Sequence, residues 1–435
     1  MDGTIAYRSG ILHFLSEPSS NTDEKSYEYY PDGILIVENG KIKAVGPAEQ
    51  LLPQVLSSMP VYAYHNHLIT PGLIDCHVHY PQLEAIASYG EQLLPWLEKY
   101  IYPVEQKFSD FHYASDMAEF FVNELLRHGT TSALVFSTVH IESVNALFDR
   151  ALQKNMRLIS GKVLSDQHIP EALKNTPEKA YAESKGLIEK WAGEGRLGYA
   201  VCPRFIPSCS ESLWQVSKRL MEEYPDIHMH THLCENKAEV EWYQKLFPKS
   251  KNAVDILEKL GALGSRSIFA HGVHLNSDEL QQLSKTQSKL VFCPSSNLFL
   301  GSGLFPYKQA QKAKIDIGLG SDIGAGTSFS LLDNLCDGYK ILQLQNETLS
   351  PLEAFYTATL GGAKVLNSDK YIGNFLPGKE ADFVIWDTSK VPLLNHRYQQ
   401  TETINDKLFL LMMLGDDRIV KQTYLCGDLV FNRLA

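Results

Sequence analysis

The sequence has 435 residues, too many for one small core, and its apolar fraction of 44% and charged fraction of 21% are those of a fully folded globular protein. With 40 basic and 51 acidic residues, its net charge of −11 disfavours attraction to nucleic acid phosphates or anionic lipids. We therefore expect a small-molecule substrate, with neither nucleic acid nor a membrane as partner.

The N-terminal residues lack the cationic stretch and apolar core of a secretory signal, and no run approaches the 18 apolar residues of a membrane span. The seven cysteines are odd in number and include no Cys-x-x-Cys pair, which argues against a zinc knuckle or a disulfide framework. We expect a cytoplasmic protein whose thiols are reduced and mostly buried.

Both ends of the chain carry β-rich patterns. Residues 34–46 contain two apolar runs around Asn39-Gly40, the strongest short signal for a hairpin. Residues 376–386 turn and then enter a strand, and residues 423–431 resemble another hairpin. The simplest arrangement is one small β domain built from both termini, with the middle of the chain inserted as a separate unit.

The middle of the chain alternates short apolar strands with helical periods, which is typical of βα units around a parallel sheet. The clearest helix is expected between the N-cap Asp110 and Gly129. Eight strands are expected near residues 73–79, 130–136, 157–163, 197–202, 227–232, 268–271, 290–293 and 315–321. An α/β fold of this kind, over about 250 residues, is a (β/α)8 barrel with its active site at the carboxyl ends of the strands. The predicted domains are 71–374 for the barrel, and 1–70 with 375–435 for the composite β domain.

Candidate metal ligands fall at the predicted carboxyl ends of several strands. His77 and His79 close the first strand on one face, since side chains i and i+2 of a strand point the same way. His232, His271 and Asp322 close the fifth, sixth and eighth strands. Four neutral imidazoles and one carboxylate would form a mononuclear site with room for water, and imidazole suits zinc, iron, copper or nickel.

The choice of His232 needs an argument, because His228, His230 and His232 alternate along one strand. A histidine on a strand is more often a hydrogen-bonded core residue than a ligand. We favour His232 because Glu235, three residues beyond it, can lie beside the reacting water and transfer protons without binding the metal.

Further histidines lie outside this constellation. His274 falls beyond the end of the sixth strand and is expected in a loop or at a helix start. His65 and His67 form a second His-x-His pair, which shows how little specificity one such pair carries. Because they precede the barrel, we assign them to the β domain rather than to the metal.

Two further segments are candidates for substrate recognition. Arg204 and Phe205 follow the fourth strand and place a forked cation beside an aromatic ring, which suits a planar heterocycle with adjacent oxygen and nitrogen acceptors. In an isolated Arg-Phe pair, however, the arginine usually lies at the surface and the phenylalanine in the core. Gln82 follows His79 by three residues and carries an amide near the metal, but the local pattern favours a solvated loop residue.

Taken together, these segments resemble the amidohydrolase superfamily and, within it, the guanine deaminases of the amidohydrolase type. The superfamily pattern consists of residues 71–79 (PGLIDCHVH), His232, His271, Asp322 and residues 377–382 (PGKEAD). The narrower pattern consists of residues 79–82 (HYPQ), 203–205 (PRF), 230–236 (HTHLCEN), 293–298 (CPSSNL) and 320–326 (GSDIGAG). One departure is Ser321, where threonine is expected. The Pro-Cys-x-x-Cys motif of the cytidine-deaminase fold, which a second class of guanine deaminases uses, is absent.

The resemblance implies specific roles for these residues. The implied metal ligands are His77, His79, His232, His271 and Asp322, the implied catalytic groups are Glu235, Asp322 and His271, and the implied substrate contacts are Gln82, Arg204, Phe205, His232, Glu235 and Asp322. It also implies one zinc ion per chain, with iron as the alternative, a homodimer, and a distorted barrel with a small β-sandwich domain. The implied reaction is hydrolysis of guanine to xanthine and ammonia in purine catabolism. Two alternatives are open: another aminated heterocycle (8-oxoguanine, a pterin or an s-triazine) and a non-catalytic scaffold.

Overall fold

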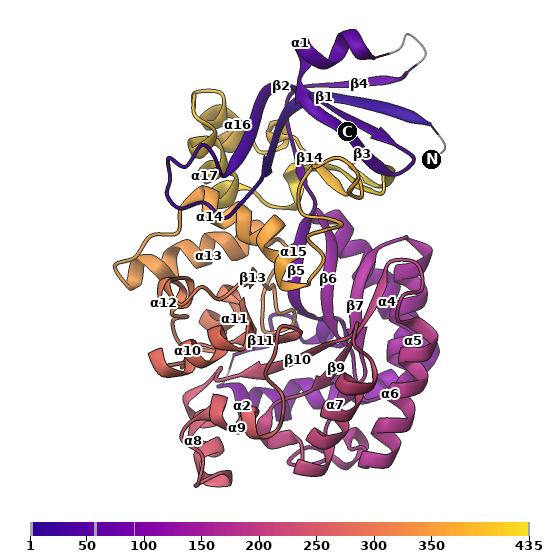
Figure 1. Cartoon of the computed structure of the whole chain (residues 1–435), viewed down its shortest axis with the longest axis vertical. Coiled ribbons are helices and arrows are strands. Elements are labelled where there is room, and N and C mark those ends of the chain that lie inside the picture. The colour runs from indigo at the N-terminus through magenta and orange to yellow at the C-terminus, as the bar shows by residue number, and fades with distance from the viewer. Residues whose placement is uncertain (1–2, 56–58, 91, 434–435) are drawn as a thin grey trace.

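Two β-sheets organise the chain in the computed structural model, which describes residues 3–55, 59–90 and 92–433 (Figure 1). One sheet combines strands from both ends of the chain and lies at the top of the view. The other is formed by the middle of the chain and lies below it, surrounded by helices. The expectation of a barrel with a separate terminal sheet is confirmed.

The first sheet has the order β16-β15-β14-β4-β1-β2-β3 in the described residues. Its strands are β1 (Thr4–Phe14), β2 (Tyr27–Glu38), β3 (Lys41–Pro47), β4 (Val61–Pro71), β14 (Phe383–Trp386), β15 (Val420–Leu425) and β16 (Asp428–Asn432). Both expected hairpins are present: β2 pairs with β3, and β15 pairs with β16. Their turns, Asn39-Gly40 and Cys426-Gly427, have the positive φ angles that tight hairpin turns require. We propose that this sheet is the core of a domain made of residues 1–70 and 375–435.

The second sheet runs parallel in sequence order from β5 to β13. Its strands are β5 (Leu73–His79), β6 (Thr130–Phe136), β7 (Arg157–Gly161), β9 (Leu197–Pro203), β10 (His228–Leu233), β11 (Ser267–His271), β12 (Lys289–Phe292) and β13 (Ile317–Leu319), with the short β8 (Val163–Leu164) paired to β9. Each of the eight predicted strands is present to within a few residues. β5 begins directly after β4, so the barrel strands start beside the first sheet and end away from it (Figure 1).

The barrel closes through the segment that follows β13. The amide of Asp322 donates to the carbonyl of His77 over 2.9 Å, and the amide of His79 donates to the carbonyl of Ile323 over 2.9 Å. These backbone bonds join the first and last strands at their carboxyl ends. The active-site rim is therefore a ring held together by main-chain contacts.

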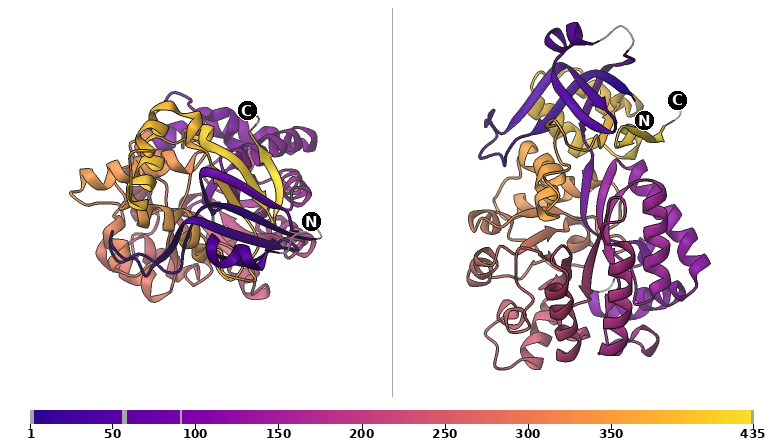
Figure 2. Two further views of the ribbon diagram at one scale, coloured as in Figure 1. Left: turned by 90° about the horizontal axis from the view of Figure 1, so that it is seen from above. Right: turned by 45° about the vertical axis from the view of Figure 1, so that its right-hand side comes forward.

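Helices cover the outside of the barrel, as the right-hand view of Figure 2 shows for α4 to α6. The longer ones are α4 (Phe111–Arg127), α5 (Ile141–Gln153), α6 (Pro177–Trp191), α7 (Glu211–Glu223), α8 (Lys237–Leu246), α9 (Ala253–Lys259), α10 (Ser277–Lys285), α13 (Leu331–Leu344), α16 (Pro392–Tyr398) and α17 (Ile404–Leu414). The shorter ones are α1 (Ala48–Leu51), α2 (Leu93–Trp96), α3 (Tyr102–Glu105), α11 (Pro294–Phe299), α12 (Tyr307–Lys312), α14 (Pro351–Tyr356) and α15 (Gly362–Val365).

Helix α4 shows how the sequence sets these boundaries. Asp110 caps it by accepting the amide protons of His112 and Tyr113 over 2.8 and 3.3 Å. Gly129 ends it with a φ of 80°, a value that glycine tolerates without strain. Both predicted ends are confirmed. None of the helices in the described residues is long and apolar enough to cross a membrane, and all seven cysteines are free thiols, five of them buried.

Candidate active site

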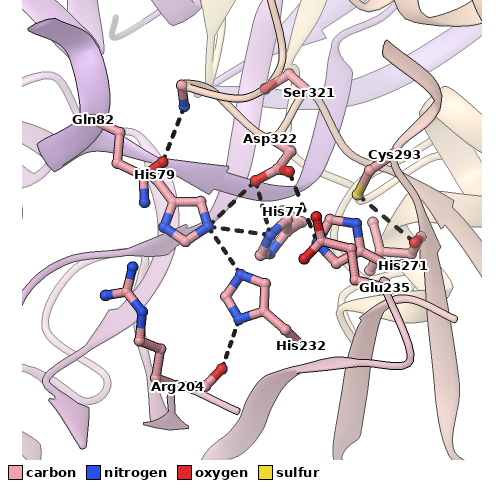
Figure 3. A network of polar contacts seen from close by, with 12 residues as sticks. His77, His79, Gln82, Arg204, His232, Glu235, His271, Cys293, Ser321 and Asp322 are labelled. Carbon is pink, nitrogen blue, oxygen red and sulfur yellow. Dashed lines mark hydrogen bonds and ion pairs between the residues drawn. The ribbon is translucent and has the colours of Figure 1, made fainter. Parts of the chain in front are cut away.

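Side chains from four strand ends meet at the carboxyl side of the barrel (Figure 3). His77 and His79 lie at the end of β5, His232 near the end of β10, His271 at the end of β11, and Asp322 shortly after β13. The structure thus brings together all five predicted ligands. In Figure 3, Gln82 and Arg204 lie on one side of His77, His79 and His232, and Glu235 and His271 lie on the other.

The spacing of the ring nitrogens suits a metal ion. His79 Nε2 lies 3.3 Å from His77 Nε2 and 3.2 Å from His232 Nε2. Asp322 Oδ1 lies 3.1 Å from His77 Nε2 and 3.3 Å from His79 Nε2. Nitrogen ligands at about 2.0–2.1 Å from a tetrahedral zinc are separated by about 3.3–3.4 Å from one another. These four side chains therefore have the geometry of one metal centre.

Hydrogen bonds on the far side of the rings keep the inner nitrogens bare. His232 Nδ1 lies 2.7 Å from the carbonyl oxygen of Arg204, and His271 Nδ1 lies 3.0 Å from Asn297 Oδ1. Because these oxygens only accept, each Nδ1 carries the proton and each Nε2 presents a lone pair. His271 Nε2 is buried without a hydrogen-bond partner in the described part of the chain. Such an orphaned acceptor fits a site built for a cation.

Burial keeps the imidazoles of His77 and His232 neutral, as metal ligation requires. It lowers the pKa of His77 to about 4, although Asp322 opposes the shift. Burial, aided by the neighbouring His77 and His79, holds the pKa of His232 well below its usual range. Both rings can therefore accept a metal at neutral pH without first losing a proton.

Glu235 is placed to transfer protons beside the cluster. It is 3% exposed, and its Oε2 lies 3.5 Å from His271 Nε2. Burial, reinforced by the charge of Asp322 and opposed by Arg204, raises the pKa of Glu235 well above its usual range. A carboxyl group in this state can hold a proton at neutral pH and donate it later.

Glu239, which was not among the predicted site residues, holds the backbone of Glu235 in place. Oε2 of Glu239, on α8, accepts the amide protons of Glu235 over 2.7 Å and of Asn236 over 3.2 Å. Burial and the charge of Glu235 raise the pKa of Glu239 to about 8. A signal was available, because Asn236 and Glu239 have the spacing of a helix capping box.

A cavity with about 440 Å³ of empty space opens onto the cluster. It is lined by His79, Gln82, Leu93, Trp96, Leu97, Arg204, Phe205, His232, Glu235, Glu239, Leu300, Asp322 and Ala325. Gln82 is 3% exposed, so the local interpretation of it as a solvated loop residue is wrong. It lies in the short 3-10 helix η2 (Tyr80–Ala85), which turns it back over the barrel.

Arg204 and Phe205 also line this cavity, each 5% exposed. Arg204 Nη1 donates to Glu105 Oε2 over 2.6 Å, and Gln82 Nε2 donates to Glu105 Oε1 over 3.3 Å. Sequence reasoning missed Glu105. No local pattern marks it, because its partners come from other segments of the chain.

The competing histidines occupy other places. His228 and His230 are buried on β10, but His230 Nε2 contacts Nδ1 of His77, the nitrogen that faces away from Asp322, and His228 lies next to Asn367. His274 Nε2 lies 2.8 Å from the carbonyl oxygen of Ser302, in the turn before α10. His65 and His67 lie on β4, in the first sheet, as expected.

Ser321, the one departure from the family pattern, keeps the function of a hydroxyl at that position. The carboxylate of Asp75 accepts the amide protons of His77 over 3.1 Å and of Ser321 over 3.0 Å, and it also accepts the hydroxyl proton of Ser321. Asp75 therefore ties the strand of one candidate ligand to the segment that carries Asp322.

A (β/α)8 barrel with histidine and aspartate side chains gathered at its carboxyl rim defines a metal-dependent hydrolase of the amidohydrolase type. Residues 68–430 match the amidohydrolase family, and the chain belongs to that family.

Among individual proteins, the chain is 49% identical to the guanine deaminase of Escherichia coli K12 over 93% of its own length and 92% of that protein's. It is 32% identical to the human guanine deaminase over 84% and 83% of the two chains. The structure of the E. coli guanine deaminase superposes with a TM-score of 0.95 at 47% identity, covering 99% of this chain and 100% of the other. The structure of the guanine deaminase from C. acetobutylicum with bound guanine in the active site gives a TM-score of 0.89 at 26% identity, with the same coverage.

Proposed function

We propose that this chain hydrolyses guanine to xanthine and ammonia. The observation that carries the proposal is the cavity in which a protonatable Glu235 and the polar groups of Arg204 and Gln82 face the histidine and aspartate cluster. The similarity to guanine deaminases along nearly the whole chain supports the same reaction.

The metal is part of the proposal. His77, His79, His232, His271 and Asp322 would hold one zinc ion per chain, with iron as the alternative. The close nitrogen spacing and the orphaned Nε2 of His271 support this assignment. A divalent metal ion in such a site supplies the Lewis acidity that makes water a nucleophile at neutral pH.

The chain itself supplies the proton transfers. Asp322, with Oδ1 toward His77 and His79, is placed to accept a proton from the attacking water. Glu235, which can be protonated at neutral pH, gives its proton to N3 of the ring as water adds at C2. The proton that Asp322 takes from the water then restores Glu235, which gives it to the departing amine, and the proton of the new C2 hydroxyl returns Glu235 to its protonated state. His271 lies 3.5 Å from Glu235 and would act on the tetrahedral centre by helping to hold the metal beside it.

The remaining cavity residues bind the purine. Arg204 donates to the O6/N7 edge, where two acceptors suit a guanidinium fork. Phe205 packs on the ring face, and its own ring is held edge-on by Trp242, with centroids 5.9 Å apart. Gln82 holds another polar edge, and His232, Glu235 and Asp322 border the reacting carbon.

We further propose a cytoplasmic homodimer that acts in purine catabolism. The decisive experiment measures the conversion of guanine to xanthine by absorbance, with metal-analysed protein, before and after chelation. Turnover that disappears with the metal and returns with zinc supports the proposal. If 8-oxoguanine, a pterin or an s-triazine is hydrolysed faster than guanine, that compound becomes the assigned substrate. A metal-loaded protein that is inactive on all of them would point to a non-catalytic scaffold.

A further inference from the structure

Glu105 lies behind the two polar residues that we assign to the purine. It ends helix α3 and is 2% exposed. Its carboxylate is shared, with Oε2 2.6 Å from Arg204 Nη1 and Oε1 3.3 Å from Gln82 Nε2. Glu105 is not among the described residues that line the cavity. It therefore contacts the proposed substrate-binding groups from behind the cavity lining.

The first consequence concerns the orientation of Gln82. A carboxylate only accepts, so Glu105 forces Nε2 of Gln82 toward itself. Oε1 of Gln82 then points toward the amide of Gly324, 3.4 Å away. If the side-chain amide of Gln82 flipped, its oxygen would face the carboxylate of Glu105, and two acceptors would lie against each other. Glu105 thereby decides which donor and acceptor Gln82 presents to the cavity.

The second consequence concerns the charge of Arg204. Its guanidinium carbon lies 5.3 Å from the centroid of the Tyr102 ring, and within the described chain Glu105 is the only carboxylate in an ion pair with it. The bond to Glu105 occupies Nη1, and no other described residue accepts a hydrogen bond from the guanidinium. Arg204 therefore offers free N–H donors to the cavity while its charge is cancelled locally.

A neutral pair of this kind favours neutral ligands. Guanine is neutral at physiological pH, whereas xanthine loses a ring proton more readily and its anion is attracted to an uncompensated guanidinium. We infer that Glu105 is a specificity-determining positioning residue that orients Gln82 and neutralises Arg204, so that the site binds the neutral substrate and releases the more acidic product. This inference rests on the proposed guanine deamination.

The test compares wild-type protein with E105Q, using E84Q as a matched control. Glu84 is a nearby glutamate that is paired with Lys107 at the surface and does not line the cavity. The measurements are KM and kcat for guanine, the inhibition constant of xanthine, and the metal content. For E105Q we expect at least a tenfold rise in KM, a change in kcat of only a few-fold, and at least a tenfold fall in the ratio of the xanthine inhibition constant to KM. E84Q should match wild type.

An unchanged ratio in folded E105Q would overturn the inference, whereas a wild-type protein that does not turn over guanine would overturn the proposed function instead. Because E105Q leaves Arg204 as an unpaired buried charge, it can fail to fold. E105D then provides the test, since it keeps the charge but shortens the side chain by one methylene. It should raise KM for guanine at least several-fold with the ratio unchanged. An unchanged KM or a fallen ratio would contradict the inference.

Discussion

His77 Nδ1 lies 2.7 Å from His230 Nε2, and His230 Nδ1 in turn lies 3.0 Å from the carbonyl oxygen of Ile268. The carbonyl can only accept, so His230 carries its proton on Nδ1 and accepts at Nε2. His77 must then donate from Nδ1, which leaves its Nε2 bare and facing Asp322. One main-chain oxygen thus fixes the tautomers of two rings in series.

We therefore predict that H230L weakens metal binding by about 10–100-fold, the range typical of lost partners of ligating histidines. H230Q is the matched variant, because an amide can accept from His77 and donate to Ile268, and it should keep most of the affinity. Competition against a chromophoric chelator measures this directly. Equal affinities of H230L and wild type would contradict the tautomer argument.

E235Q should bind metal as wild type does but lose turnover by about 10²–10⁴-fold, the usual contribution of a general acid and base. The amide keeps the shape of the side chain and removes the exchangeable proton. Metal analysis and ammonia release, measured on the same sample, separate the two effects. Near-normal ammonia release would remove Glu235 from the mechanism.

His228 should make the fold sensitive to acid. It is 8% exposed, and burial, with the charges of Lys289 and Arg266, lowers its pKa to about 4. Between pH 6.5 and 4 the unfolded chain binds a proton that the folded chain does not, so the free energy of unfolding falls as the pH falls, by up to about 3 kcal/mol.

In H228Q this contribution is absent, so its stability loss between pH 7 and 4.5 should be smaller than that of wild type by about 2 kcal/mol. Urea unfolding at the two pH values gives the comparison, and the other buried histidines are common to both proteins. Parallel losses in the two proteins would show that His228 does not carry the effect.

D110A should destabilise the protein by about 0.5–2 kcal/mol, because the loss of the Asp110 cap leaves two amides of α4 without their acceptor. D110N, which can still accept, is the control and should lose much less. The urea midpoint at neutral pH measures both. Equal midpoints for D110A and wild type would mean that solvent satisfies these amides as well as Asp110 does.

The sequence predicts the barrel well because most of its strands are short apolar runs with clear boundaries, and the candidate ligands follow from which residues end the strands. It predicts Gln82 poorly on local grounds, since burial of a short helix over the barrel depends on distant packing. Glu105 could not be found this way. Its partners Gln82 and Arg204 lie 23 and 99 residues away in the sequence, and only the folded chain brings the three together.

The backbone bonds that join His77 and His79 to the segment after β13 have a bearing on biogenesis. During synthesis, the first two histidines leave the ribosome long before Asp322, and they cannot form the complete ligand set until the last strand has docked. An unfinished chain therefore exposes a partial, weaker chelating pair. Loading of the metal should report that the whole barrel has been completed, which makes metal content a practical measure of correct maturation.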